Sequence, residues 1–323
     1  MKRSFKQRLS LLALPDITNI IFLLFLALLS LIFCFKIPGW YYIFVTNIIL
    51  SVIVTFIVSD YEGGDRNRKT LWRFIRYWYI FFMIIFCFKE IYVFMIYLTP
   101  GVYDPLIIKW DNAIFFGHNP NLALNSIQRP WLTEFLQVVY VSFYIMPYIY
   151  TIELFVWHRY EELKYAMFVL FFGFYLSFIG YLFLPAIGPR FTLFDFTKID
   201  TELPGLWLTN SIRAIIDLGE SIPHNVTDPE NYAQRDAFPS GHTMMIILIT
   251  YLSQKIKSKS FYFYLPYCCL MIFSTVYLRY HYVSDLISGG LLSIVTVIVA
   301  NHIYKKKGIH FGAEEKIVKQ LKL

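Results

Sequence analysis

The chain has 323 residues, of which 57% are hydrophobic and 20% aromatic, while only 16% carry a charged side chain. These proportions exclude an ordinary soluble domain of this length. The formal charge of +7 does not indicate a nucleic-acid partner, because the basic residues cluster in short loops between apolar runs and no nucleic-acid-binding module is visible.

The first apolar run, residues 17–35, follows a basic start and is too long for a cleaved signal peptide, so it is expected to remain as a helix. A helix needs roughly 20 residues to cross about 30 Å of hydrocarbon. Seven further runs approach or exceed that length, at residues 40–59, 77–98, 131–157, 166–186, 240–254, 261–278 and 283–304. The sequence therefore predicts an all-α, polytopic membrane bundle of about eight transmembrane helices.

The distribution of basic residues predicts the orientation of this bundle. Eight spans place both termini on one side, and the segments on that side hold twenty lysines and arginines, against eight in the segments on the other side. By the positive-inside rule both termini are then cytoplasmic. We expect an integral protein of a bacterial plasma membrane.

Two long outer segments, residues 99–130 and 187–239, carry Pro, Gly, Asn and Asp among scattered apolar residues and are expected to fold over the outer mouth. Residues 105–116 could form an amphipathic stretch along the surface, and residues 207–218 a short helix.

Lys89 and Glu90 interrupt the third span, where an ionisable side chain is by default a functional candidate. An ion pair between helices or a lysine that snorkels to the surface is the alternative. Adjacent residues do not face each other on a helix, so each needs its own partner, and Glu134 or Glu153 is the expected partner of Lys89.

The first motif that carries chemistry is Ala-Phe-Pro-Ser-Gly-His-Thr at residues 237–243. Pro then Ser before an apolar run predicts a helix start, at which the backbone N–H groups of Ser240, Gly241 and His242 lack partners. Such a helix N-terminus favours anions, and a glycine allows a phosphate to approach the backbone closely.

The second motif is Ser-Thr-Val-Tyr-Leu-Arg-Tyr-His-Tyr-Val-Ser-Asp at residues 274–285. His281 and Asp285 are four residues apart, so on a helix the carboxylate can hold one ring nitrogen and leave the other free to attack. Arg279 and Arg190 could place guanidinium groups on a phosphate, and Arg235 is a further candidate. Tyr280 and Tyr282 are expected at the membrane interface, as tyrosine commonly is.

A single histidine at a membrane edge is usually structural. Two histidines at the outer ends of adjacent spans, one after Pro-Ser-Gly and the other with Asp285 and Arg279 nearby, indicate chemistry instead.

Together these motifs resemble those of the type 2 phosphatidic acid phosphatase superfamily, which includes lipid phosphatases and vanadium haloperoxidases. The resemblance implies that His281 attacks phosphorus to form a phosphohistidine, that Asp285 orients it, and that His242 protonates the leaving oxygen. It further implies that Ser240 and Gly241 bind phosphate oxygens without any metal or other cofactor. The expected division is residues 1–98 as additional helices, 99–304 as a catalytic membrane core of six helices, and 305–323 as a basic cytoplasmic tail.

The chain departs from the common phosphatases in two places. Thr275 stands where they carry an arginine, and Arg129-Pro130 lacks their lysine upstream, because Leu122 occupies that position. The Gly-Pro-Arg ending at Arg190 and the Tyr-Leu-x-x-His-Tyr-x-x-Asp pattern look more like the inositol phosphorylceramide synthase branch, whose members transfer a phosphorylated head group between lipids.

The leading hypothesis is an enzyme that removes or transfers a phosphoryl group of a lipid phosphate at the outer leaflet. A head-group phosphotransferase similar to inositol phosphorylceramide synthases is the second hypothesis. A transporter lined by Lys89, Glu90 and the histidines is a third, although the two related halves common in transporters are not visible. The expected partners are a lipid phosphate and membrane lipids, and the sequence leaves the oligomeric state open.

Overall fold

The computed structural model describes residues 3–306 except 65–69, 100, 221, 224, 225 and 227. Over these residues the chain is helical, and its β-type pairing is limited to an isolated bridge between Ala186 and Asp236. The expected cytoplasmic tail, residues 305–323, lies outside the described residues from position 307 onward.

A helix forms at every predicted span. Five are long and apolar enough to cross a membrane, namely α2 (Leu14–Ile32), α3 (Trp40–Glu62), α4 (Thr70–Leu98), α9 (Tyr160–Phe183) and α15 (Val283–Lys306). The pair α7 (Pro130–Ser142) and α8 (Met146–Val156) makes a sixth if it is one broken span. Two further helices, α13 (Gly241–Lys255) and α14 (Phe261–Tyr277), are shorter than the roughly 20 residues that a full membrane crossing needs. Length and composition thus support five or six crossings where eight are predicted from sequence.

The single long span predicted at residues 131–157 is bent by 52° between α7 and α8. Pro147 lies in the first turn of α8. Proline has no backbone N–H and cannot continue the hydrogen-bond ladder of the preceding turn, which accounts for the break.

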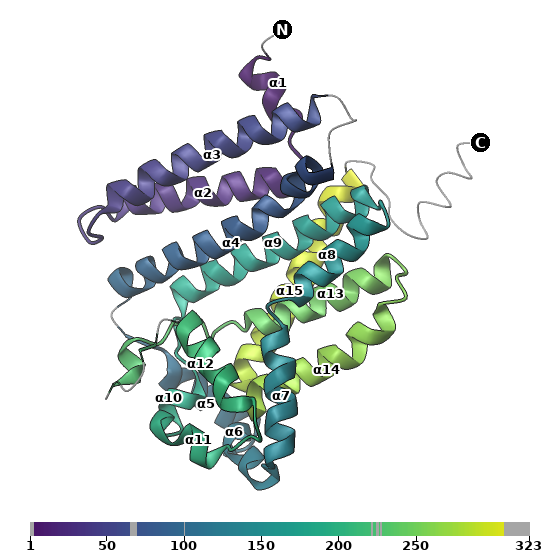
Figure 1. Cartoon of the computed structure of the whole chain (residues 1–323). Coiled ribbons are helices and arrows are strands. Elements are labelled where there is room, and N and C mark those ends of the chain that lie inside the picture. The colour runs from purple at the N-terminus through teal and green to yellow at the C-terminus, as the bar shows by residue number, and fades with distance from the viewer. Residues whose placement is uncertain are drawn as a thin grey trace.

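Short helices gather at one end of the bundle, opposite the end that carries α1 (Phe5–Leu9) (Figure 1). They are α5 (Asp104–Ile114), α6 (Pro120–Ala123), α10 (Pro189–Thr192), α11 (Ile199–Glu202) and α12 (Thr209–Gly219), with 3-10 turns at Leu124–Ile127, Phe196–Lys198 and Pro229–Asn231. The short helix predicted at residues 207–218 is confirmed as α12, and the amphipathic stretch predicted at residues 105–116 forms α5.

Glu134, on α7, holds the start of α12. Its Oε2 atom accepts hydrogen bonds from four successive amides, those of residues 206–209, at 3.0 to 3.1 Å, and from the Thr209 hydroxyl at 2.9 Å. The carboxylate thereby satisfies donors that a helix N-terminus leaves open and interacts favourably with the helix dipole. This anchor fixes α12 at the end of the bundle where the short helices gather (Figure 1).

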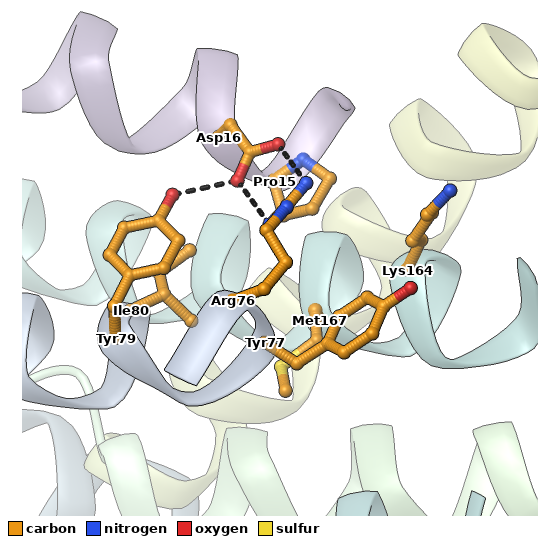
Figure 2. Close-up of a pocket in the computed structure, with 8 residues that line it drawn as sticks. All are labelled: Pro15, Asp16, Arg76, Tyr77, Tyr79, Ile80, Lys164 and Met167. Atoms are coloured by element: carbon orange, nitrogen blue, oxygen red, sulfur yellow. Dashed lines mark hydrogen bonds and ion pairs between the residues drawn. The ribbon is translucent and has the colours of Figure 1, made fainter. Parts of the chain in front are cut away.

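A buried ion pair ties the N-terminal helices together. The Arg76 guanidinium on α4 bonds both Asp16 carboxylate oxygens on α2, the closer at 2.7 Å, and the Tyr79 hydroxyl donates to the same carboxylate (Figure 2). Asp16 is 1% and Arg76 3% exposed. Removing one partner of such a pair leaves an uncompensated buried charge and typically costs about 3–5 kcal/mol.

Lys89 and Glu90 of α4 each have a separate partner. Lys89 donates to the carbonyl oxygen of Gly219 at 3.1 Å, and Glu90 accepts from the Asn47 amide of α3 at 2.7 Å. Neither expected partner of Lys89 takes that role, because Glu134 caps α12 and Glu153 accepts from the Ser258 hydroxyl. The prediction for Lys89 is therefore wrong: the lysine extends to the end of α12.

Candidate active site

The first motif forms a helix start, as predicted. Ser240 is the N-cap of α13, and its hydroxyl accepts from the Thr243 amide at 3.2 Å. The Ser240 amide is not free for an anion, because it donates to the Asp285 carbonyl at 3.0 Å. Within the described residues this leaves the amides of Gly241 and His242 as the open donors of the helix N-terminus.

The second motif places His281 in the turn between α14 and α15, facing His242. The distance from His281 Nε2 to His242 Nδ1 is 3.2 Å. On the other side of the ring, His281 Nδ1 lies 2.9 Å from the Ala237 carbonyl oxygen and 3.3 Å from Asp285 Oδ2. One histidine ring therefore bridges both motifs.

These contacts determine where the protons lie. A carbonyl oxygen can only accept, so His281 Nδ1 carries the proton and its Nε2 presents a lone pair. Burial lowers the pKa of His281 to about 4, so the ring is neutral at pH 7. His242 Nδ1 must then donate to His281, and His242 Nε2 is buried without a hydrogen-bond partner in the described structure.

Asp285 holds the site together. Its Oδ2 atom also accepts from the Tyr282 amide at 2.8 Å, and its carbonyl binds the Ser240 amide. On the next turn of α15, a Cβ on Gly289 would lie 2.4 Å from the Ser240 carbonyl oxygen. Only glycine permits this approach of α15 to the start of α13.

Aromatic rings support the two histidines. The His242 ring stacks on Tyr140 of α7 at 4.7 Å, and Tyr140 stacks on Tyr280 at 4.1 Å. Gln137 donates to the Tyr280 hydroxyl at 3.1 Å. Tyr280 is 6% and Tyr282 0% exposed, so both rings pack inside the protein. Their predicted depth at the membrane interface stays a prediction.

Arg190 is the cation that the structure brings to this cluster. Its guanidinium lies 4.8 Å from the centre of the Tyr280 ring, and its charge acts on His281. Two carboxylates of the α12 end hold it, Asp217 at 3.3 Å and Glu220 in a closer ion pair. An anion that binds Arg190 must therefore compete with Glu220.

The other two predicted cations are engaged elsewhere. Arg279 lies over the Phe194 ring at 3.7 Å and pairs with Glu202 at 2.7 Å. Arg235 donates to the Thr99 carbonyl at 2.6 Å. Their contribution to phosphate binding stays a prediction.

Asp104 and Asp111 of α5 hold two backbone segments of the site in place, and the sequence analysis did not identify either residue. Asp104 accepts from the amides of Ile187 and Gly188 at 3.0 and 2.8 Å, immediately before Arg190. Asp111 accepts from the amides of Val283 and Ser284 at 3.0 and 2.8 Å, at the start of α15. Their spacing of seven residues, which puts both on one helix face, is the signal that could have found them.

The arrangement can perform nucleophilic chemistry on an anion. It combines an unprotonated ring nitrogen, a second ring that carries a proton 3.2 Å away, a helix N-terminus and a nearby guanidinium. In the described part of the chain, no group of three or more His, Cys, Asp or Glu side chains is placed to hold a metal ion.

Comparison with known protein families gives one match. The family model described as the PAP2 superfamily matches residues 105–299. This segment begins in α5 and ends within α15, so it contains both histidine motifs and leaves α1 to α4 outside. No curated protein and no solved structure matches the chain.

Proposed function

Because the chain belongs to the PAP2 superfamily, whose model matches 105–299, we propose that it is a membrane enzyme that hydrolyses or transfers the phosphoryl group of a lipid phosphate. The observation that carries the proposal is the pairing of the two histidines, in which His281 Nε2 lies 3.2 Å from His242 Nδ1.

In the proposed first step, the His281 Nε2 lone pair forms a bond to phosphorus and the bond from phosphorus to the lipid oxygen breaks. His242, which must first bind a second proton at Nε2, gives that proton to the leaving oxygen. The positive charge that develops on the His281 ring is stabilised through Nδ1 by Asp285 Oδ2 and the Ala237 carbonyl. The product is a phosphohistidine, and no metal takes part in the step.

In the second step, the oxygen of water or of an alcohol attacks the phosphohistidine, loses its proton to His242, and releases His281 Nε2 with its electron pair. The open amides of Gly241 and His242 and the guanidinium of Arg190 are suited to stabilise the phosphoryl oxygens in both steps. The site is thus compatible with hydrolysis and with transfer, and the acceptor decides which occurs.

The transferase alternative rests on the Gly188-Pro189-Arg190 segment and the pattern around His281, which look like the inositol phosphorylceramide synthase branch. The site is expected to face the extracytoplasmic side. This follows from the excess of basic residues in the opposite segments, and the site helices lie at the end of the bundle away from α1 (Figure 1). We further propose that residues 1–98 are additional to a catalytic core at 99–304.

The test uses the purified full chain in liposomes that contain phosphatidic acid labelled in its phosphate, with and without a long-chain alcohol. We expect released phosphate without the alcohol, and a new phosphate ester with it if the transferase alternative holds. Acid-labile label should be trapped on the wild-type protein and not on His281→Ala. Absence of both products from the wild-type protein across several lipid phosphates would refute the proposal.

A further inference from the structure

Helix α12 exposes large apolar side chains along one of its faces. On the helix, Ile215 is 63% and Leu218 is 77% exposed, and just before it Trp207 is 86% and Leu208 is 53% exposed. Residues 208, 215 and 218 are separated by seven and three positions, a spacing that puts side chains on the same face of a helix. These four residues form the exposed apolar face of α12.

The opposite face of α12 is buried, and it holds polar groups as well as the apolar Ile216. The Thr209 hydroxyl donates to the Glu134 carboxylate at 2.9 Å, and the Arg213 guanidinium donates to the Leu203 carbonyl at 2.6 Å. A helix on the surface of a soluble protein has the reverse pattern, in which apolar residues face the core and charged residues face water. The pattern of α12 is therefore that of a helix whose outer face does not lie in water.

The contacts of α12 locate it beside the apolar helices of the bundle. It packs on α7, whose Glu134 holds its first turn, and its last residue, Gly219, accepts from Lys89 of α4 at 3.1 Å. Lys89 precedes Leu98, where the apolar span of α4 ends, by nine residues, which is about 13 Å along a helix. A lysine side chain is shorter than this distance. The end of α12 thus lies alongside the span of α4 and not beyond it.

Both helices that hold α12 expose apolar side chains close to these contacts. On α4, between Lys89 and the end of the span, Ile96 and Tyr97 are exposed. On α7, on the turns around Glu134, the exposed residues are Trp131, Phe135 and Val138. In a bundle of membrane-spanning helices, such apolar surface faces lipid. A lipid leaflet therefore covers the neighbours of α12 at the same level.

We propose that α12 is an interfacial helix whose exposed apolar face, formed by Trp207, Leu208, Ile215 and Leu218, binds the lipid leaflet at this end of the bundle. Amphipathic helices of this kind lie in the plane of the interface with their apolar face about 5–10 Å deep, and tryptophan is enriched at that level. The proposal goes beyond the enzymatic function and does not depend on it.

The proposal has a consequence for the site. Asp217 and Glu220, at the end of α12, hold Arg190. A helix that is fixed in the leaflet would keep these two carboxylates, and with them the guanidinium, at a constant depth.

The test measures the surroundings of single nitroxide labels on the full chain in liposomes, with the four native cysteines replaced. Labels are placed at Ile215→Cys and Leu218→Cys. Oxygen concentrates in the hydrocarbon, whereas a charged nickel chelate stays in water, so the ratio of their collision rates reports the depth of each label. Both positions should show a higher ratio than the control Thr201→Cys on α11, and should approach Leu291→Cys on the exposed face of α15.

Ratios at 215 and 218 equal to that of Thr201→Cys would overturn the proposal. So would exclusion of both reagents, in which case spin–spin broadening would identify a second copy of the chain as the cover of this face. A second measurement leaves the cysteines in place: quenching of tryptophan fluorescence by brominated lipids, compared between the wild-type protein and Trp207→Phe. The variant should lose a part of the quenchable emission, and an equal quenchable part in both proteins would refute the contact of Trp207 with lipid.

Discussion

The contacts of His281 predict an unusual tolerance to substitution of Asp285. In many sites with paired Asp and His the carboxylate selects the tautomer, and its replacement by asparagine costs about 10⁴-fold because the wrong nitrogen is then protonated. Here the Ala237 carbonyl lies closer to His281 Nδ1, at 2.9 Å against 3.3 Å for Asp285 Oδ2. Because this carbonyl only accepts, the proton stays on Nδ1 whichever residue stands at 285.

The magnitude follows from what Asp285→Asn retains. The oxygen that accepts from both Tyr282 and His281 is a single atom, Oδ2, and an asparagine carbonyl can replace it. The new NH₂ group would take the place of Oδ1, which is buried without a partner in the described structure. The loss is then that of one charge-assisted hydrogen bond, about 1.5–3 kcal/mol, or roughly 10- to 100-fold in kcat.

The assay is phosphate release by the purified variants in liposomes, with thermal unfolding as the check on folding. His281→Ala removes the nucleophile itself, and its kcat should fall by ~10⁴-fold or more. Equal losses in Asp285→Asn and His281→Ala, with both variants folded, would refute the argument from the Ala237 carbonyl.

Three further predictions follow from the site. Burial, partly offset by Arg190, raises the pKa of Glu220 from 4.5 to about 7. As the pH rises through 7, Glu220 ionises and competes with the substrate phosphate for Arg190. The KM should therefore increase over this range, and Glu220→Gln should remove the increase. The pKa of Glu220 in the folded protein lies above its ordinary value, so Glu220 contributes less to the free energy of unfolding as the pH rises from about 4.5 to 7. Denaturation of the wild-type protein and of Glu220→Gln at both pH values checks this. Activity should survive chelators and be inhibited by vanadate, because His281 supplies the nucleophile; loss in EDTA that Mg²⁺ restores would contradict this. With native cysteines replaced, an impermeant thiol reagent on intact cells should modify Thr201→Cys and spare Ser258→Cys, whereas the reverse pattern would place the site in the cytoplasm.

Much of the helical framework could be predicted from sequence, because long apolar runs have few alternatives in a bilayer. The break in residues 131–157 could not be located, since proline within a membrane run is compatible with either a kink or a continuous helix. Pro147 in the first turn of α8 accounts for the break only once the bend is observed.

The histidine motifs were predictable because their spacing is local: His281 and Asp285 are only four residues apart. The partners of Arg190 were not, since Asp217 and Glu220 reach it only after residues 191–220 fold back over the bundle. The contact of Lys89 could not be predicted from sequence for a different reason. It is a backbone carbonyl, and any residue type can provide one.

The position of α12 connects these findings. Its first turn is held by Glu134 of α7, and the residues at its end hold Arg190 and Lys89. Because one rigid helix joins the three contacts, a substrate phosphate that displaces Glu220 from Arg190 acts on the same helix end that Lys89 binds. Phosphate binding is then coupled to the position of α12, and a substitution at Glu134 should weaken it.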